Sequence, residues 1–358
     1  MSTAPPEQAS GRVRKRLGLG RLGRLVARRA RFVIIQLAGA ATAAFFLIRL
    51  VPGDPARVIA GPAASEQVLA AIRRHLGLDQ SLPVQYWRYL TNLVRGDLGN
   101  SITTGQPVFD DLVQRVPATL ELISLAMLVS LLLGIPLGFA MARRRLRGKG
   151  KVIFGYAMFS GSIPDFWLAL IVAFIFAYTW GILPPPIGRL GFETPPERVT
   201  GFLTIDSVLA GDLATLWLAL QHLALPVLTL TLVYSGLIVK VANAASEQAM
   251  RAGFNDLYAS VGIRQALTNR RLVRLALPPV ATVAGITYGF LLGGSVLVEQ
   301  IYSWGGIGQY AVSALRSADF AALQGFIVLA AVFNIVNYLL VDVVLWMVDP
   351  RLGRKGSA

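Results

Sequence analysis

The chain has 358 residues, of which 54% are hydrophobic and 15% are charged. Soluble domains average about a quarter charged residues, so this composition excludes an ordinary soluble protein and indicates an integral membrane protein. The 34 lysines and arginines outnumber the 19 aspartates and glutamates, but they lie beside apolar segments, which favours topology signals and anionic lipid over nucleic acid. The absence of cysteine excludes disulfides and thiolate metal sites, and His75 and His222 are too far apart in sequence to predict a multi-histidine site.

The first 31 residues are rich in arginine and precede an apolar run of about 20 residues, 32–51. No small-residue cleavage site of the A-x-A kind follows this run convincingly. We therefore expect a basic cytosolic tail, 1–31, and a first membrane span that is retained as a signal anchor.

Six apolar segments are long enough to cross about 30 Å of hydrocarbon as helices. They are 32–51, 116–142, 152–180, 214–239, 279–301 and 321–347. Basic residues crowd the N-terminal tail, the connections 143–151 and 240–278, and the C-terminal residues 350–358, whereas the third and fifth connections carry only Arg189, Arg198 and Arg316. The positive-inside rule then predicts that both termini are cytosolic. The first connection, 52–115, holds six arginines and weakens the contrast, but long loops follow the rule less strictly.

That first connection is expected to be a small extracytoplasmic helical domain. Ser65 can begin a helix that Gly77 can close. A second amphipathic helix is expected around 84–90, and its aromatic residues mark either the membrane interface or a packed small core. The third connection, 181–213, contains three consecutive prolines and should be an ordered outer loop with a short helix near Ser207.

The cytosolic loop 240–278 contains the most informative pattern, an amphipathic helix over about 247–262. Its apolar face is formed by residues at helical spacing: Met250, Phe254, Leu257, Tyr258 and Val261. Gly262 follows at once and can end the helix in a left-handed turn. Such a helix either lies on lipid headgroups or docks into a groove on a cytosolic partner.

Several motifs are missing from the sequence. It has no G-x-x-x-x-G-K-[ST] phosphate loop, so we expect no ATP hydrolysis by this chain, and it has neither H-E-x-x-H nor G-x-S-x-G. We therefore assign no catalytic, cofactor-binding or metal-binding residue. Four acidic residues belong to the spans but are expected near their ends: Glu121, Asp165, Glu299 and Asp342. Because an ion-coupled carrier should bury such groups near the membrane centre, this pattern favours a substrate path that is powered from outside the chain.

An ordered set of short motifs carries a family resemblance. The motifs are Arg49–Pro55 (RLVPGDP), the stretch Leu76–Val108, Arg115–Glu121, Gly134–Gly138, Ser162–Trp167, His222–Pro226, Gly293–Gly308 and Asp349–Arg351. Over about 32–353 the chain resembles the integral permease subunit of ABC importers of the dipeptide, oligopeptide and nickel group, of the type with an extracytoplasmic domain after the first span. The resemblance implies an all-α membrane protein with six transmembrane helices in the type I importer permease fold.

The resemblance also implies a role for the amphipathic helix, which in this family sits in a cleft of the ATPase subunit. The family pattern of the loop is E-A-A, three residues, then G; counting back from Gly262 places Asp256, Leu257 and Tyr258 at its first three positions, with Ala259 next. Leu257 and Tyr258 are larger than the small residues of that pattern. The coupling set is therefore Met250, Phe254, Asp256, Leu257, Tyr258, Ala259, Val261 and Gly262.

The partners implied by the family are a second homologous permease, two ATP-binding subunits that hold ATP and magnesium, an extracytoplasmic substrate-binding protein, a peptide substrate and the lipid bilayer, with no nucleic acid. This chain itself would hold no cofactor and would lie in the inner membrane of a bacterium. Import of nickel or a nickel chelate is the alternative within the family. A membrane scaffold without transport and a secondary carrier are the alternatives outside it.

Overall fold

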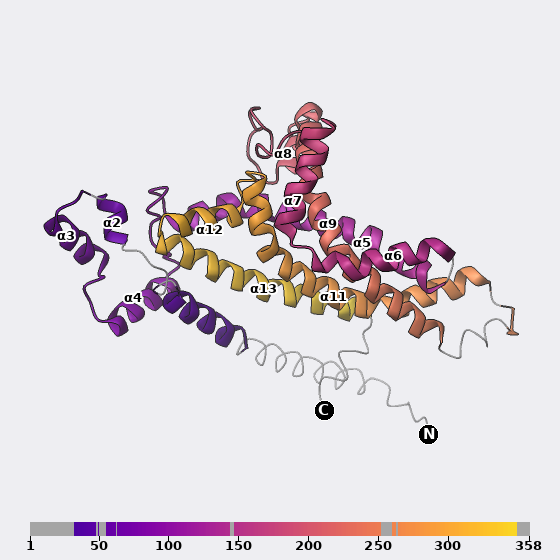
Figure 1. The fold of residues 1–358 in the computed structure, drawn as a ribbon. Coiled ribbons are helices and arrows are strands. Elements are labelled where there is room, and N and C mark those ends of the chain that lie inside the picture. The colour runs from indigo at the N-terminus through magenta and orange to yellow at the C-terminus, as the bar shows by residue number, and fades with distance from the viewer. Residues whose placement is uncertain are drawn as a thin grey trace, which may run out of the picture.

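The computed structural model describes residues 32–47, 49, 55–61, 63–143, 147–251, 260–262 and 264–348. These residues are mainly helical and contain no named strand, only an isolated bridge between Asn100 and Pro107. Figure 1 shows an elongated molecule in which the long helices run side by side. The short helices α2, α3 and α4 lie at one end, and the C-terminal end of α9 and the N-terminal end of α11 lie at the other. The all-α class predicted from the sequence is confirmed for the described residues.

The N-terminal part contains the helix Phe32–Leu47 and then α2 (Pro55–Ala60), α3 (Glu66–Leu76) and α4 (Leu82–Val94). As expected, the Ser65 hydroxyl accepts a hydrogen bond from the Val68 N–H at the start of α3. Gly77 ends that helix with φ of 68°, in the left-handed region that glycine adopts without strain.

Helix α4 packs against the helix Phe32–Leu47 through its aromatic residues. The Tyr86 and Thr42 hydroxyls lie 2.7 Å apart, and the ring of Phe45 lies within 5.7 Å of the rings of Tyr86 and Tyr89. Trp87 points away and is 69% exposed. The aromatic residues of this helix therefore fall into two groups. The two tyrosines form a small packed cluster, and the tryptophan is free to contact another surface.

Within the described residues, four helices are long and apolar enough to cross a membrane: α5 (Val108–Ala142), α9 (Leu213–Met250), α11 (Gln265–Ile301) and α13 (Phe320–Val348). Within their apolar windows α9 is 67% buried and α13 only 11%. Helix α9 is thus central to the described bundle, and α13 presents most of its apolar surface outward, as a lipid-facing or subunit-facing helix does.

The third apolar segment differs from a straight helix. It forms α6 (Arg147–Phe159), a 3₁₀ turn (Ser160–Ser162), α7 (Asp165–Ala173) and a π-helical turn (Phe174–Thr179), and its two halves are bent by 113°. Pro164 precedes α7 and lacks the N–H that would continue the helix. Asp165, which was expected near the end of a span, lies instead at this bend, in the middle of the segment 152–180.

The number of spans therefore stays a prediction. The four long helices qualify, and the bent pair makes five if it crosses the membrane as one unit. The described part of the first segment, Phe32–Leu47, is apolar but shorter than the others. Two short helices complete the fold, α8 (Leu203–Leu209), which includes Ser207 as expected, and α12 (Ile307–Arg316).

Candidate functional site

The predicted coupling loop, 240–278, is shorter in the structure, because 240–250 belong to α9 and 265–278 belong to α11, which leaves 251–264 between the two helices. Met250 is the last residue of α9, Val261 is 65% exposed, and Gly262 has φ of 68°, the left-handed conformation expected for it. Phe254, Asp256, Leu257, Tyr258 and Ala259 lie outside the described residues. The amphipathic face is therefore still a prediction, while the turn after it has the geometry that the sequence predicts.

The two helices that carry this loop are held by close packing against α5. A Cβ on Gly138 would lie 2.6 Å from the Val239 carbonyl oxygen and 2.7 Å from Ala242 Cβ, so only glycine permits this approach of α5 to α9. The Arg143 guanidinium, just after α5, donates a hydrogen bond to the Asn269 side chain on α11. The loop is thus connected to three long helices, so a force on it reaches the whole bundle.

At the end of the bundle that carries α12, Glu299 organises the chain. Its side chain is fully buried, accepts a hydrogen bond from the Thr119 hydroxyl at 2.6 Å, and accepts from the N–H groups of Gly308 and Gln309. A carboxylate at the start of α12 satisfies N–H groups that have no partner within the helix. Added Cβ atoms on Gly306 and Gly308 would meet this carboxylate at 2.5 and 2.9 Å, which explains the Gly305–Gly308 sequence.

A second carboxylate, Glu121 on α5, fastens the loop 181–213. Arg189 Nη2 lies 2.5 Å from Glu121 Oε2, and the Thr204 N–H and hydroxyl donate to Oε1 at 2.8 and 2.6 Å. Glu121 is 6% exposed, and a buried ion pair of this kind is stable only when hydrogen bonds satisfy the remaining oxygen. Two parts of the loop, around Arg189 and at the start of α8, are thereby held by one residue of α5.

Within the same loop, Asp206 closes a tight turn. Its carboxylate accepts hydrogen bonds from the N–H and hydroxyl of Thr200, both at 2.7 Å, and from the Gly201 N–H at 2.9 Å. Burial alone would raise the pKa of this carboxyl, but these donors outweigh it and hold the pKa below its ordinary value. Asp206 is therefore ionised at neutral pH and acts as a structural acceptor.

The segment before α5 is fixed to α12 and α13 in a similar way. Asp319 is fully buried and accepts from the Ser101 hydroxyl at 2.6 Å, the Thr103 N–H and the Ala322 N–H. Asp111 accepts from the Thr104 hydroxyl and the Tyr310 hydroxyl. The hydrogen bonds from Ser101 to Asp319 and from Tyr310 to Asp111 join residues 218 and 199 positions apart, and together with the contacts of Glu121 and Glu299 they connect the segments at this end of the bundle.

Sequence reasoning missed these tied carboxylates as a group. It placed Glu121 and Glu299 near span ends and assigned them no partner; Glu299 lies close to the end of α11, whereas Glu121 lies well inside α5. The sequence does contain a signal for Glu299, because glycines at 305, 306 and 308 follow it closely and glycine permits the backbone to approach a side chain. The partners of Glu121 and Asp319 are too distant in sequence to be found this way.

The described chain is therefore a bundle of long apolar helices in which most buried carboxylates serve as acceptors for backbone and hydroxyl groups, the arrangement of a multi-pass membrane protein. The chain matches the family model of the binding-protein-dependent transport system inner membrane component over residues 134–354. It matches the N-terminal model of the same systems over residues 22–123. The chain belongs to this family, and the resemblance drawn from its motifs is confirmed.

Curated relatives align over almost the whole chain. A probable D,D-dipeptide transport system permease protein of Escherichia coli K12 is 40% identical over 335 residues, covering 91% of this chain and 96% of the relative. A dipeptide transport system permease protein of Alkalihalophilus pseudofirmus is 33% identical, with coverage of 91% and 98%. A di/tripeptide transport system permease protein of Pseudomonas aeruginosa is also 33% identical, with the same coverage.

Proposed function

We propose that this chain is the membrane-spanning permease subunit of an ATP-driven importer that takes up di- or oligopeptides delivered by a substrate-binding protein. The observation that carries the proposal is the family match together with relatives named for peptide transport, aligned over 91% of the chain. The missing phosphate loop agrees with ATP hydrolysis by partner subunits that bind ATP and magnesium.

In this proposal the chain pairs with a second, homologous permease around a central path. Two ATPase subunits move the coupling helix 247–262, and α9 and α11 carry that movement into the bundle. The packing of Gly138 against the α9 backbone supports this transmission, because tightly packed helices move as rigid bodies and shift between discrete arrangements.

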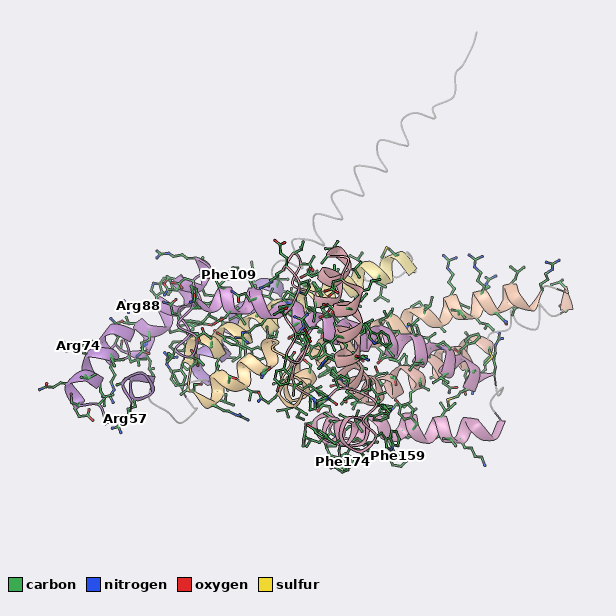
Figure 2. The ribbon with its side chains drawn as sticks, turned by 90° about the horizontal axis from the view of Figure 1, so that it is seen from above. Arg57, Arg74, Arg88, Phe109, Phe159 and Phe174 are labelled. Atoms are coloured by element: carbon green, nitrogen blue, oxygen red, sulfur yellow. The ribbon has the colours of Figure 1, made fainter. Side chains whose placement is uncertain are left out.

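The proposed topology has six spans and both termini in the cytosol of a bacterium with this chain in its inner membrane. Helices α2 to α4 and the loop 181–213 then form an extracytoplasmic surface that receives the binding protein. Figure 2 shows Arg57, Arg74 and Arg88 on those helices. A basic surface there fits an acidic contact patch on the binding protein, which charge complementarity would steer into place.

Nickel or nickel-chelate import remains the alternative cargo, and no observation favours it over peptides. The three relatives named above are peptide permeases, and in either case the binding protein would hold the cargo. A scaffold without transport and a secondary carrier are less compatible with the family match.

The test is a mild-detergent pull-down of the tagged chain from its native membrane, analysed by mass spectrometry. A tagged multi-pass protein of another family serves as the control for non-specific capture. We expect a second permease and one or two ATPase chains in amounts comparable to the bait. Recovery of the chain alone, under conditions that preserve other membrane complexes, would contradict the proposal.

A further inference from the structure

Asp165 is a carboxylate in an unusual place. It begins α7 at the 113° bend of the third apolar segment, between two stretches of apolar helix. In sequence the bend lies between two exposed aromatic residues, Phe159 at the end of α6 and Phe174 just after α7, which are 70% and 65% exposed and are labelled in Figure 2. A charged group among such residues is costly in a membrane, so it faces a cavity, water or a partner rather than lipid.

The side chain of Asp165 is directed toward two other long helices. Its Oδ2 lies 3.5 Å from the hydroxyl oxygen of Tyr234, in the middle of α9. A Cβ on Gly294 of α11 would lie 2.1 Å from that hydroxyl and 2.9 Å from Oδ2, so a glycine is required for the three helices to meet. The neighbouring Gly293 has open space around it and is exposed, which leaves room next to the carboxylate.

Asp165 differs from the other carboxylates of the bundle in its lack of donors. Five of them accept two or more hydrogen bonds from other residues: Asp111, Glu121, Asp206, Glu299 and Asp319. Asp165 has only the long contact to Tyr234 and a 3.1 Å hydrogen bond from the adjacent Phe166 N–H. In the described parts of the chain it makes no ion pair, and its side chain is half-buried.

A half-buried carboxylate with spare acceptor positions is matched to a cation. Calcium and magnesium take six or more oxygen ligands, which one carboxylate and one phenol do not supply. A primary ammonium has three donors and a single charge, and a carboxylate with a hydroxyl beside it satisfies it well. Every peptide with a free amino terminus carries such a group whatever its side chains are.

We propose that Asp165, with the Tyr234 hydroxyl beside it, is a subsite for the ammonium group of the peptide cargo inside the translocation path. The inference rests on the proposed function and deepens it. The subsite gives the amino terminus of the peptide cargo one weak contact of opposite charge, in a region where the apolar segments would otherwise offer it nothing to bind. Such a contact accepts cargo of varied sequence and requires a positive charge at one end.

The experiment uses the assembled importer with its binding protein in proteoliposomes, and compares uptake of a dipeptide with uptake of the same dipeptide acetylated at its amino terminus. The variants are Asp165→Asn, which removes the charge at constant size, Asp165→Glu, which keeps it, and Tyr234→Phe. Uptake of each cargo by a variant is divided by uptake of that cargo by the wild type. The preference of the binding protein then cancels in the ratio.

We expect Asp165→Asn to reduce uptake of the free dipeptide roughly tenfold, the typical loss of one charge-assisted hydrogen bond, and to leave uptake of the acetylated dipeptide unchanged. Asp165→Glu should retain most uptake, Tyr234→Phe should lose less uptake than Asp165→Asn, and all variants should keep subunit composition and stimulated ATPase activity.

Equal uptake ratios for the two cargoes would overturn the subsite. Loss of the second permease from the Asp165→Asn complex would also overturn it and assign Asp165 to a subunit contact. A wild-type complex that imports no peptide overturns the proposed function itself.

Discussion

At the scale of a residue, Asp206 shows how one carboxylate holds a loop. Its folded-state pKa lies below the ordinary value of 3.8 because Thr200 and Gly201 donate to it. A lowered pKa means that the stabilisation is complete above the ordinary pKa and is lost as the pH falls through the folded-state value. We therefore expect the turn 199–206 to become accessible to acid protease below about pH 4, and to be resistant at higher pH.

The Asp206→Asn variant is the control for this pH dependence. It cannot ionise, so its turn should be cleaved at the same rate across the range from pH 3 to pH 5, as measured by peptide mapping of the purified complex. A wild-type turn with the same pH-independent rate would contradict the role given to the carboxylate.

Gly262 carries the residue-scale prediction for coupling. Its φ of 68° is accessible to glycine and, at modest cost, to asparagine, whereas a β-branched residue is penalised by about 1–2 kcal/mol or more. Among the described residues, no atom outside its immediate chain neighbours lies within 4 Å of a Cβ placed there, so the penalty that we expect comes from the backbone conformation. We expect Gly262→Val to lower transport severely and Gly262→Asn to lower it slightly.

The measurement for Gly262 is uptake together with ATPase activity in the assembled importer. Gly262→Val should keep subunit assembly and basal ATPase activity and lose the stimulation by loaded binding protein. Full transport by Gly262→Val would refute the left-handed turn as a requirement for coupling.

Residues whose partners are close in sequence could be predicted, and the others could not. The cap at Ser65 and the left-handed glycines at 77 and 262 follow from local rules, and the structure has all three. The bond from Ser101 to Asp319 spans 218 positions, so no spacing rule reveals it. Asp165 was misplaced although the sequence alone puts it midway between the predicted bounds 152 and 180, and the bend at that position is what the sequence analysis did not predict.

At the scale of an element, the contact between α5 and α9 depends on Gly134 and Gly138. Added Cβ atoms at these positions would meet Ile238 at 2.7 Å and the Val239 carbonyl oxygen at 2.6 Å. A backbone atom cannot move aside as a flexible side chain does, so we expect Gly138→Ala to destabilise the chain by about 1–3 kcal/mol through overpacking.

Gly155 on α6 is the matched control, because a Cβ there meets nothing within 4 Å. Gly155→Ala should leave stability unchanged or raise it by about 0.5–1 kcal/mol, as alanine favours a helix over glycine. Thermal unfolding of the purified protein in detergent gives both values, and a melting temperature for Gly138→Ala equal to that of the wild type would contradict the glycine-dependent contact.

The elements themselves were largely predictable from hydrophobicity, apart from their shapes. Four of the six apolar segments correspond to α5, α9, α11 and α13, and all four helices extend beyond the predicted bounds. Extensions such as Lys240–Met250 are polar and lie past the apolar run, so a hydropathy window ends too early. The division of 152–180 into α6 and α7 falls at Pro164, which lacks the N–H that would continue the helix, and a hydropathy window does not register that effect.

At the scale of the whole molecule, the predicted topology can be tested with single cysteines, because the natural chain has none. The native Val94 in α4 is 87% exposed. The Val94→Cys variant should therefore react with a membrane-impermeant maleimide in intact cells. Lys151→Cys, in the first turns of α6 and within the basic connection 143–151, should react only after the membrane is opened. Labelling of Lys151→Cys in intact cells would show that the topology is the reverse of the predicted one.

The central claim is that this chain forms half of a path for peptides and is driven by partner ATPases. The most direct test reconstitutes the two permeases and the ATPases in proteoliposomes and follows a labelled dipeptide with the binding protein on the outside. The account predicts that the dipeptide accumulates only when ATP, the binding protein and this chain are all present. It also predicts that Gly262→Val abolishes this accumulation. Accumulation that persists without ATP, or no accumulation from the complete and correctly assembled complex, would contradict it.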